Sequence, residues 1–429
     1  MVIMDYKKYD CGAYRLHVVK TNKFKSVHIE VQFRSEMERE EAVKRTMLVD
    51  YLTDTCNNYP THKDMAIRFE ELYNTSYYGS TSRTGNILNS VIVSDFISPK
   101  YIDEKNYLEE VISFLCEILF NPKADNNEFS EVEFNVVKEK IKLETVSIDN
   151  NPVRKSIKRA LENVCKNTRT SYSLFGNLEM IDKVTTRNLY DSYLNMLDND
   201  SCDIFVIGDI DSELLNKLFE KYFTLKSKNT SYFDLYVNNE FSNKTNVIEE
   251  KDKFVQTSLN IIYNVQSMSD YEKNIVFPVF NYLLGSGGLT CKLYQTVREK
   301  NSLCYSIGSI FLKYDYLYII QVSLEEKDKD KSISLIKKCV KEMQDGIFSD
   351  VEIDEAKINL INSLDMSLDS SVSILNSYVY NYLDNLPLLE ERKELFKKVT
   401  REDIINVSKK IKINTIYSLV GEQNEKDRN

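Results

Sequence analysis

The chain has 429 residues, enough for two or three domains, and its few glycines (11) and prolines (6) indicate dense secondary structure rather than long loops. A net charge of −10 argues against a nucleic-acid partner, because phosphate binding needs a basic face. No stretch approaches the roughly 18 apolar residues of a membrane span, and the N-terminus lacks the apolar segment of a signal peptide. We therefore expect a cytoplasmic protein that makes no membrane contact.

Strands dominate the start of each half of the chain and helices the remainder. The alternation of Val27, Ile29, Val31 and Phe33 predicts the second of two strands over 12–34. Further elements of the first half are expected as helices from about 41 and after a capping box at Thr61, strands over 76–97, helices over 106–166, a helix from 184, a strand ending at Gly208, and a helix capped by Asp211 or Ser212.

The second half repeats this order. We expect a strand at 256–265, helices at 269–284 and 289–300, a strand at 304–322, helices from 329 to about 410, and a last strand ending at Gly421. The eight cysteines form no C-x-x-C pair and lie mostly in apolar segments, which predicts buried free thiols in a reducing compartment.

Three sequence anchors show that the two halves are copies. The segment FSEVEFNVVKEKI at 129–141 returns as FSDVEIDEAKINL at 348–360. The Val-Thr pair at 184–185 returns at 399–400, and each leads into a β-rich run ending in glycine, at Gly208 and Gly421. This period is too long for a solenoid and indicates two tandem homologous domains.

The predicted fold class is therefore α+β, with an antiparallel-rich sheet in each domain and helices packed on one face. We predict an N-terminal domain at 1–224, a polar Asn/Lys/Ser-rich linker at 225–252 and a C-terminal domain at 253–429. The two domains are expected to face each other as a clamshell across a cavity.

The segment LGSGGLTCKLYQTVREKNSLCYSI at 284–307 resembles the signature of the insulinase (pitrilysin) metallopeptidase family. Arg298, Glu299, Lys300, Leu303 and Tyr305 fall at the family spacing, followed by Ser306. Departures are Thr-Cys-Lys at 290–292, where a Ser-Ser-Arg-like run is usual, and Asn-Ser at 301–302, where Arg-Gly is common. The duplicated plan and the long helices opening with FSEVE and FSDVE extend the resemblance over nearly the whole chain.

Active members of that family carry an H-x-x-E-H motif on a helix of the first domain and a glutamate ligand on a later helix. Histidines four residues apart share a helix face and can both bind Zn²⁺, while the glutamate activates the metal-bound water. By the family pattern, Arg45, Leu48 and Val49 occupy the motif positions here and Lys140 the position of the later ligand. None of these supplies a zinc ligand, so the resemblance implies no metal and no cofactor.

The three histidines, at 17, 28 and 62, form no i,i+4 pair and stand beside no cysteine motif. We expect His17 and His28 to be sheet residues and His62 a first-turn helix residue. A Cys-His nucleophile pair is not excluded by the sequence, but no motif supports one.

The resemblance gives Arg298 and Tyr305 a second role besides that of an exposed helix-end cation and a half-buried strand aromatic. In active members this pair holds the substrate carbonyl and the oxyanion opposite the zinc, and fixed donors of that kind are worth about 10²–10³ in kcat. Gly287 and Gly288, in the glycine-rich turn, are predicted to contact substrate.

A chain that keeps this pair but lacks the zinc residues resembles one subunit of a split enzyme. We expect no activity from the chain alone, and a zinc-bearing insulinase-family subunit or a second copy of the chain as partner, with a peptide or protein as substrate. The alternative is a catalytically silent scaffold. This reading fits the resemblance to a zinc-less subgroup associated with aminopentanol modification of elongation factor P. A respiratory-complex core subunit fits less well, since the chain has no targeting segment.

Overall fold

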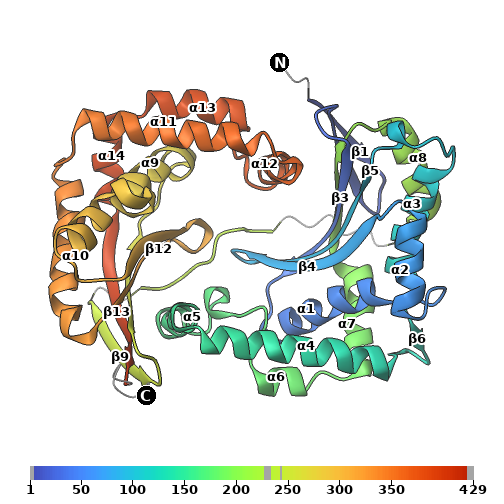
Figure 1. Ribbon diagram of the computed structural model, residues 1–429, viewed down its shortest axis with the longest axis horizontal. Helices are drawn as coiled ribbons and strands as arrows, with labels where there is room; N and C mark the ends of the chain where they lie inside the picture. The colour runs from blue at the N-terminus through green and yellow to red at the C-terminus, as the bar shows by residue number, and fades with distance from the viewer. Residues whose placement is uncertain (1–3, 227–232, 242–243, 423–429) are drawn as a thin grey trace. The chain divides into compact units, whose positions relative to one another are not determined.

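The computed structural model describes residues 4–226, 233–241 and 244–422. The chain divides into two compact units (Figure 1), made of residues 1–146, 172–235 and 370–379 in the first, and 147–171, 236–369 and 380–429 in the second. Across the described residues, no helix combines the length and the apolar character that crossing a bilayer requires.

The first unit contains a six-stranded sheet in the order β1-β2-β8-β3-β5-β4. Its strands are β1 (Asp5–Asp10), β2 (Arg15–Lys20), β3 (Ser26–Glu36), β4 (Ser76–Thr84), β5 (Ile87–Ile97) and β8 (Ser201–Gly208). A short β6 (Ala124–Asp125) and β7 (Glu128–Phe129) form a separate hairpin. Strand β8 runs parallel to β2 and antiparallel to β3, and the remaining neighbours are antiparallel.

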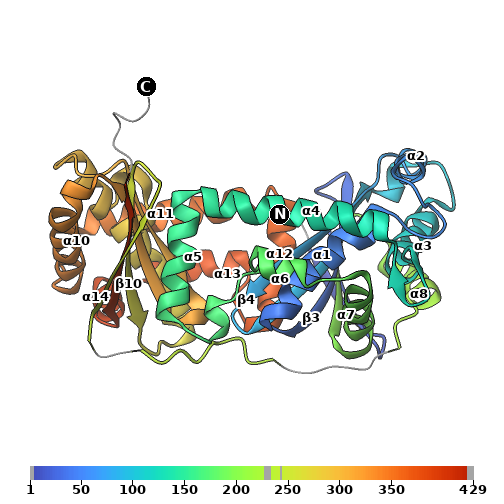
Figure 2. The same ribbon diagram turned by 90° about the horizontal axis from the view of Figure 1, so that it is seen from below.

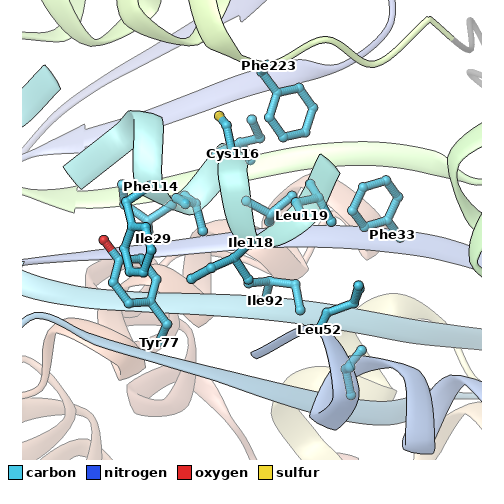
Figure 3. Close-up of a cluster of buried hydrophobic side chains, with 14 of the residues drawn as sticks. Ile29, Phe33, Leu52, Tyr77, Ile92, Phe114, Cys116, Ile118, Leu119 and Phe223 are labelled. Carbon is cyan, nitrogen blue, oxygen red and sulfur yellow. The ribbon is translucent and has the colours of Figure 1, made fainter. Parts of the chain in front are cut away.

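One face of this sheet is apolar and carries the helices of the first unit. These helices are α1 (Arg39–Asp54), α2 (His62–Glu71), α3 (Tyr107–Phe120), α4 (Glu131–Asn150, as far as 146), α6 (Leu178–Asp182), α7 (Thr186–Asn199) and α8 (Ser212–Tyr222). Ile29 and Phe33 of β3 meet Ile118 and Leu119 of α3 in the buried core (Figure 3). The alternation predicted for β3 is confirmed, because its odd-numbered residues from 27 to 33 are fully buried in this core.

The second unit contains a five-stranded sheet in the order β11-β12-β10-β13-β9. Its strands are β9 (Asn246–Asp252), β10 (Thr257–Val265), β11 (Ser306–Leu312), β12 (Leu317–Leu324) and β13 (Ile411–Gly421). Its helices include α9 (Phe277–Asn281), α10 (Lys329–Gln344), α11 (Asp350–Ser367), α13 (Leu389–Lys398) and α14 (Arg401–Ser408). The π-helical turns are η3 (Glu272–Val276), η4 (Tyr282–Ser286) and η6 (Tyr294–Glu299). The 3₁₀ turns are η5 (Gly288–Thr290), η7 (Lys313–Asp315) and η8 (Glu326–Asp328).

The two sheets share one topology. The order β2-β8-β3-β5-β4 corresponds strand by strand to β9-β13-β10-β12-β11, and both contain a parallel pair at the same place, β2 with β8 and β9 with β13. Strand β1 is an addition to the first sheet. The common topology supports the duplication inferred from the sequence anchors.

Two predicted segments, the linker at 225–252 and the strand at 304–322, have a structure that differs from the expected one. Part of the predicted linker at 225–252 is strand β9, which pairs in parallel with β13; within it, 227–232 and 242–243 lie outside the described residues. The side chains of β9 are mostly exposed, so the segment has no apolar alternation that could reveal a strand. The predicted single strand at 304–322 is a hairpin of β11 and β12, which turns at Tyr316 with a φ of 52°.

The other difference is an exchange of helices between the two sequence halves. Helix α5 (Pro152–Val164) follows α4 in sequence but belongs to the second unit (Figure 2), and residues 370–379 of α12 (Ser371–Asp384) belong to the first. In the second unit, Asn260 of β10 donates to Ser156 Oγ at 2.5 Å, and Ser156 donates to the carbonyl of Ser258 at 3.2 Å. Helix α5 therefore covers the face of that sheet opposite α10 and α14, whereas the sequence predicted helices on one face only.

Local capping explains where several helices begin. Thr61 and Asp64 form the predicted capping box of α2, and Asp211 caps α8 by accepting from two backbone amides. Reciprocal capping boxes also open α7 at Thr185, α11 at Ser349 and α14 at Thr400.

Candidate functional site

Arg45 of α1, which stands at one of the lost motif positions, is a fully buried structural residue. Its Nη1 donates to Asp200 Oδ2 at 2.6 Å, and its Nε donates to Glu41 Oε1 at 2.8 Å. Burial alone would lower the pKa of Arg45, but the charges and hydrogen bonds of Asp200 and Glu41 together outweigh burial and raise that pKa. The guanidinium is a permanent cation committed to these partners and cannot bind a metal ion.

Leu48 and Val49 are also buried in the first unit. Val49 lies against β4 so closely that a Cβ on Gly79 would come within 2.3 Å of the Val49 carbonyl oxygen. Only glycine fits at position 79, which lets α1 approach this edge strand.

Lys140 of α4 pairs with the residue that follows Val49. Helix α4 passes beside α1 (Figure 1 and Figure 2), and Lys140 Nζ lies 2.8 Å from Asp50 Oδ2. One step along a helix rotates a side chain by about 100°. The α1 residues at motif spacing that share this side with Asp50 are therefore Thr46 and Val49, one position later than the sequence pattern gave.

The place beside Lys140 thus holds an ion pair instead of metal ligands. Thr46 Oγ1 lies 3.0 Å from Thr81 Oγ1 of β4 and donates to the carbonyl of Leu174 at 3.0 Å. Within the part of the chain that the structure describes, no three histidine, cysteine or acidic side chains gather as a metal site. A signal for this register was present in the sequence, since Thr46, Asp50 and Thr53 form a polar i, i+4, i+7 stripe within the otherwise apolar segment 46–53.

The predicted sheet histidines lie in a polar network that the sequence did not reveal. His17 Nε2 is 3.0 Å from Asp203 Oδ1, and Arg15 binds the same buried carboxylate through two nitrogens, at 2.6 and 2.9 Å. Arg34 also pairs with Asp203. Burial, followed by the charge of Lys8, lowers the pKa of His17 to about 3, so the ring is neutral near pH 7.

His28 has the opposite charge state. Its Nδ1 lies 2.7 Å from Asp95 and its Nε2 lies 3.0 Å from Glu30. Burial opposes the charge on the ring, but the hydrogen bonds to Asp95 and Glu30 outweigh it and raise the pKa of His28 to about 9. Both histidines are structural members of the sheet, and His62 stands in the first turn of α2 as predicted.

Arg298 is the exposed cation of the second unit that the sequence singled out. It lies in η6, where its Nη1 donates to the Tyr294 hydroxyl at 2.7 Å. Its guanidinium carbon also lies 4.9 Å from the centre of the Tyr294 ring, within the range of a cation–π contact. The surface of the unit therefore holds Arg298 against one aromatic side chain.

Tyr305 immediately precedes β11, and its ring is 46% exposed. Its backbone amide donates to the carbonyl of Ser323 at 2.8 Å, which extends the β11–β12 ladder. Its hydroxyl donates to Glu325 Oε1 at 3.1 Å, and Lys327 pairs with the other oxygen of that carboxylate. Hydrogen bonds from Lys327 and then Tyr305 lower the pKa of Glu325, so the carboxylate is charged.

Gly287 and Gly288 make the turn between η4 and η6. A Cβ on Gly287 would lie 2.6 Å from the Tyr282 carbonyl oxygen, and Gly288 adopts a φ of 61°. Both positions thus require glycine for local geometry. Their predicted contact with substrate stays a prediction.

Comparisons with known proteins agree with this picture. Residues 183–360 match the family model described as "Peptidase M16 inactive domain". The probable inactive metalloprotease YmfF of Bacillus subtilis is 26% identical over 414 residues, which is 96% of each chain. The chain is thus similar to proteins of the peptidase M16 (insulinase) family.

A further relative and a solved structure are also similar to this chain over most of its length. The non-peptidase homolog YmxG of Helicobacter pylori is 24% identical over 318 residues, covering 72% of this chain and 70% of that one. The crystal structure of a conserved protein from Enterococcus faecalis superposes with a TM-score of 0.91 at 26% identity, covering 98% of this chain and 100% of that one. This chain is therefore a homologue of M16 peptidase relatives that are described as inactive.

Proposed function

We propose that this chain is the non-zinc, peptide-binding subunit of a heterodimeric M16 peptidase and that it supplies Arg298 and Tyr305 to a zinc site held by its partner. The observation that carries the proposal is an asymmetry between the units. The first unit has an ion pair, Asp50 with Lys140, where an active member would hold metal, while the second presents Arg298 and Tyr305 at its surface.

The chemistry of the two side chains suits this role. Arginine is a permanent cation with a fork of N–H donors that can bind a carbonyl oxygen, and a tyrosine hydroxyl can donate to a developing oxyanion. Donors fixed before the reaction lower the barrier more than flexible ones, because no reorganisation is needed as charge develops. The partner would supply the zinc and the activated water. This chain would bind and polarise an extended peptide in the cytoplasm, a compartment that suits its eight free cysteines.

The test is reconstitution with a zinc-bearing M16 chain encoded by the same organism. Tyr305→Phe removes only the hydroxyl, so it should lower kcat about 10-fold or more with little change in subunit affinity. Arg298→Ala should lower turnover further, because it removes both charge and reach. Tyr101→Phe and Lys300→Ala are matched controls at exposed positions and should leave turnover unchanged.

The second candidate is a silent scaffold, including one associated with elongation factor P modification. It is favoured by the fully buried Arg45–Asp200 pair and by the names of the relatives, which describe those proteins as inactive or non-peptidase. If both Arg298→Ala and Tyr305→Phe leave turnover of the mixture unchanged, or if no zinc-bearing chain binds, the scaffold is the better account.

A further inference from the structure

Arg298 is held in place more firmly than its position at the surface would lead one to expect. An exposed arginine side chain carries about 2 kcal/mol of rotamer entropy and ordinarily samples many orientations. Here the guanidinium has both a directional hydrogen bond and a cation–π contact, and both come from Tyr294. These contacts use different parts of the tyrosine, the hydroxyl for the first and the ring face for the second.

The local backbone makes this pairing possible. Residues four apart lie on one face of a helical turn, so Tyr294 and Arg298 are neighbours along η6. The wide turn of η6 is closed by the Lys300 amide, which donates to the carbonyl of Gln295 at 3.1 Å. π-helical turns of this kind occur frequently at functional sites.

The charge of Arg298 also acts on Cys304, in the segment that precedes β11. Burial raises the pKa of the Cys304 thiol to about 11, and the positive charge of Arg298 opposes that rise.

We propose that Tyr294 is a positioning residue for Arg298, fixing the guanidinium through its hydroxyl and its ring before any peptide binds. The guanidinium has five N–H donors, so the hydrogen bond to Tyr294 leaves other N–H groups that can bind a peptide. For turnover, this inference rests on the proposed function. The positioning itself is a property of the isolated chain and can be measured there.

The first arm measures the reactivity of Arg298 in the isolated chain. Phenylglyoxal, a dicarbonyl that modifies arginine, is added to the wild type, Tyr294→Phe and Tyr294→Leu, and the rate at Arg298 is followed by peptide mass spectrometry. Arg187 serves as the internal reference, because it is exposed and pairs with the surface residue Asp191 among the described residues. The rate at Arg298 should rise several-fold in Tyr294→Leu and less in Tyr294→Phe, which keeps the ring. Equal rates at Arg298 in all three proteins would overturn the proposal.

The second arm measures turnover of the complex with the zinc-bearing chain. Tyr294→Leu should lower kcat about 10-fold, and the double variant with Arg298→Ala should be no slower than Arg298→Ala alone, because residues acting through one group are not additive. A double variant slower than Arg298→Ala would show that Tyr294 acts independently of the arginine, against the proposal. If the reactivity arm succeeds but Arg298→Ala leaves turnover unchanged, the positioning stands and the proposed function fails.

Discussion

Replacing Arg45 with methionine should destabilise the first unit strongly. Arg45 is fully buried, and its partner Asp200 is only 2% exposed, so the substitution leaves a buried carboxylate without its cation. Removing one partner of a buried ion pair costs about 3–5 kcal/mol. For a unit of this size, each kcal/mol shifts the melting temperature by roughly 2–4 °C, so Arg45→Met should lower it by about 10 °C.

The assay is calorimetric unfolding of the full chain at pH 7 and pH 5. Burial raises the pKa of Asp200 even while Arg45 opposes that rise, and without Arg45 it should rise further. Protonation of Asp200 would then relieve the unpaired charge, so the loss should be smaller at pH 5. Arg187→Met, at an exposed ion pair worth about 0–1 kcal/mol, is the control. A change of less than 2 °C in Arg45→Met would refute the reasoning.

Three further outcomes can be checked. The pKa of His28 is about 9 in the folded chain and about 6.5 in the unfolded chain. The stability that His28 contributes is therefore complete below pH 6.5 and is lost as pH rises through 9. The melting temperature of the wild type should decline over that range, and that of His28→Gln should decline less. The fragment 253–429 lacks α5 and β9, so it should bind a hydrophobic dye and show no cooperative calorimetric transition; a sharp transition would contradict the exchange of helices. Glu325→Gln weakens the acceptor that fixes the Tyr305 hydroxyl, so kcat of the reconstituted complex should fall; unchanged turnover would mean that this contact does not position the donor.

The duplication could be predicted because the anchors lie in long helices and buried strands, where the sequence pattern is strong. Strand β9 could not, since its side chains are exposed and its stabilisation comes from backbone pairing with β13. The sequence also could not predict the placement of α5 against the second sheet. An amphipathic helix shows that one face is buried, but the sequence does not say against which sheet.

At the candidate site, the sequence also could not predict the register of helix α1 to within one residue. The family pattern pointed to α1 and Lys140, but the register along a helix depends on which α1 side chain meets α4 in space. A shift of one residue turns the helix by about 100°, which replaces the buried Val49 with the ion-paired Asp50 as the last residue of the pattern. Only the contact between Lys140 and Asp50 distinguishes the two registers.

The partners of Arg45, Lys140 and Thr46 bear on how the first unit is stabilised. A site that had merely lost its ligands would leave buried polar groups without partners, at a cost of about 1–3 kcal/mol each. Arg45 instead has Asp200, Lys140 has Asp50 and Thr46 has Thr81, so the first unit is stabilised without metal. Arg298 and Tyr305 are different, because exposed contacts such as theirs add little stability. The stability of the fold therefore does not explain why both side chains are held in defined positions. Binding a peptide beside a partner's zinc would explain it.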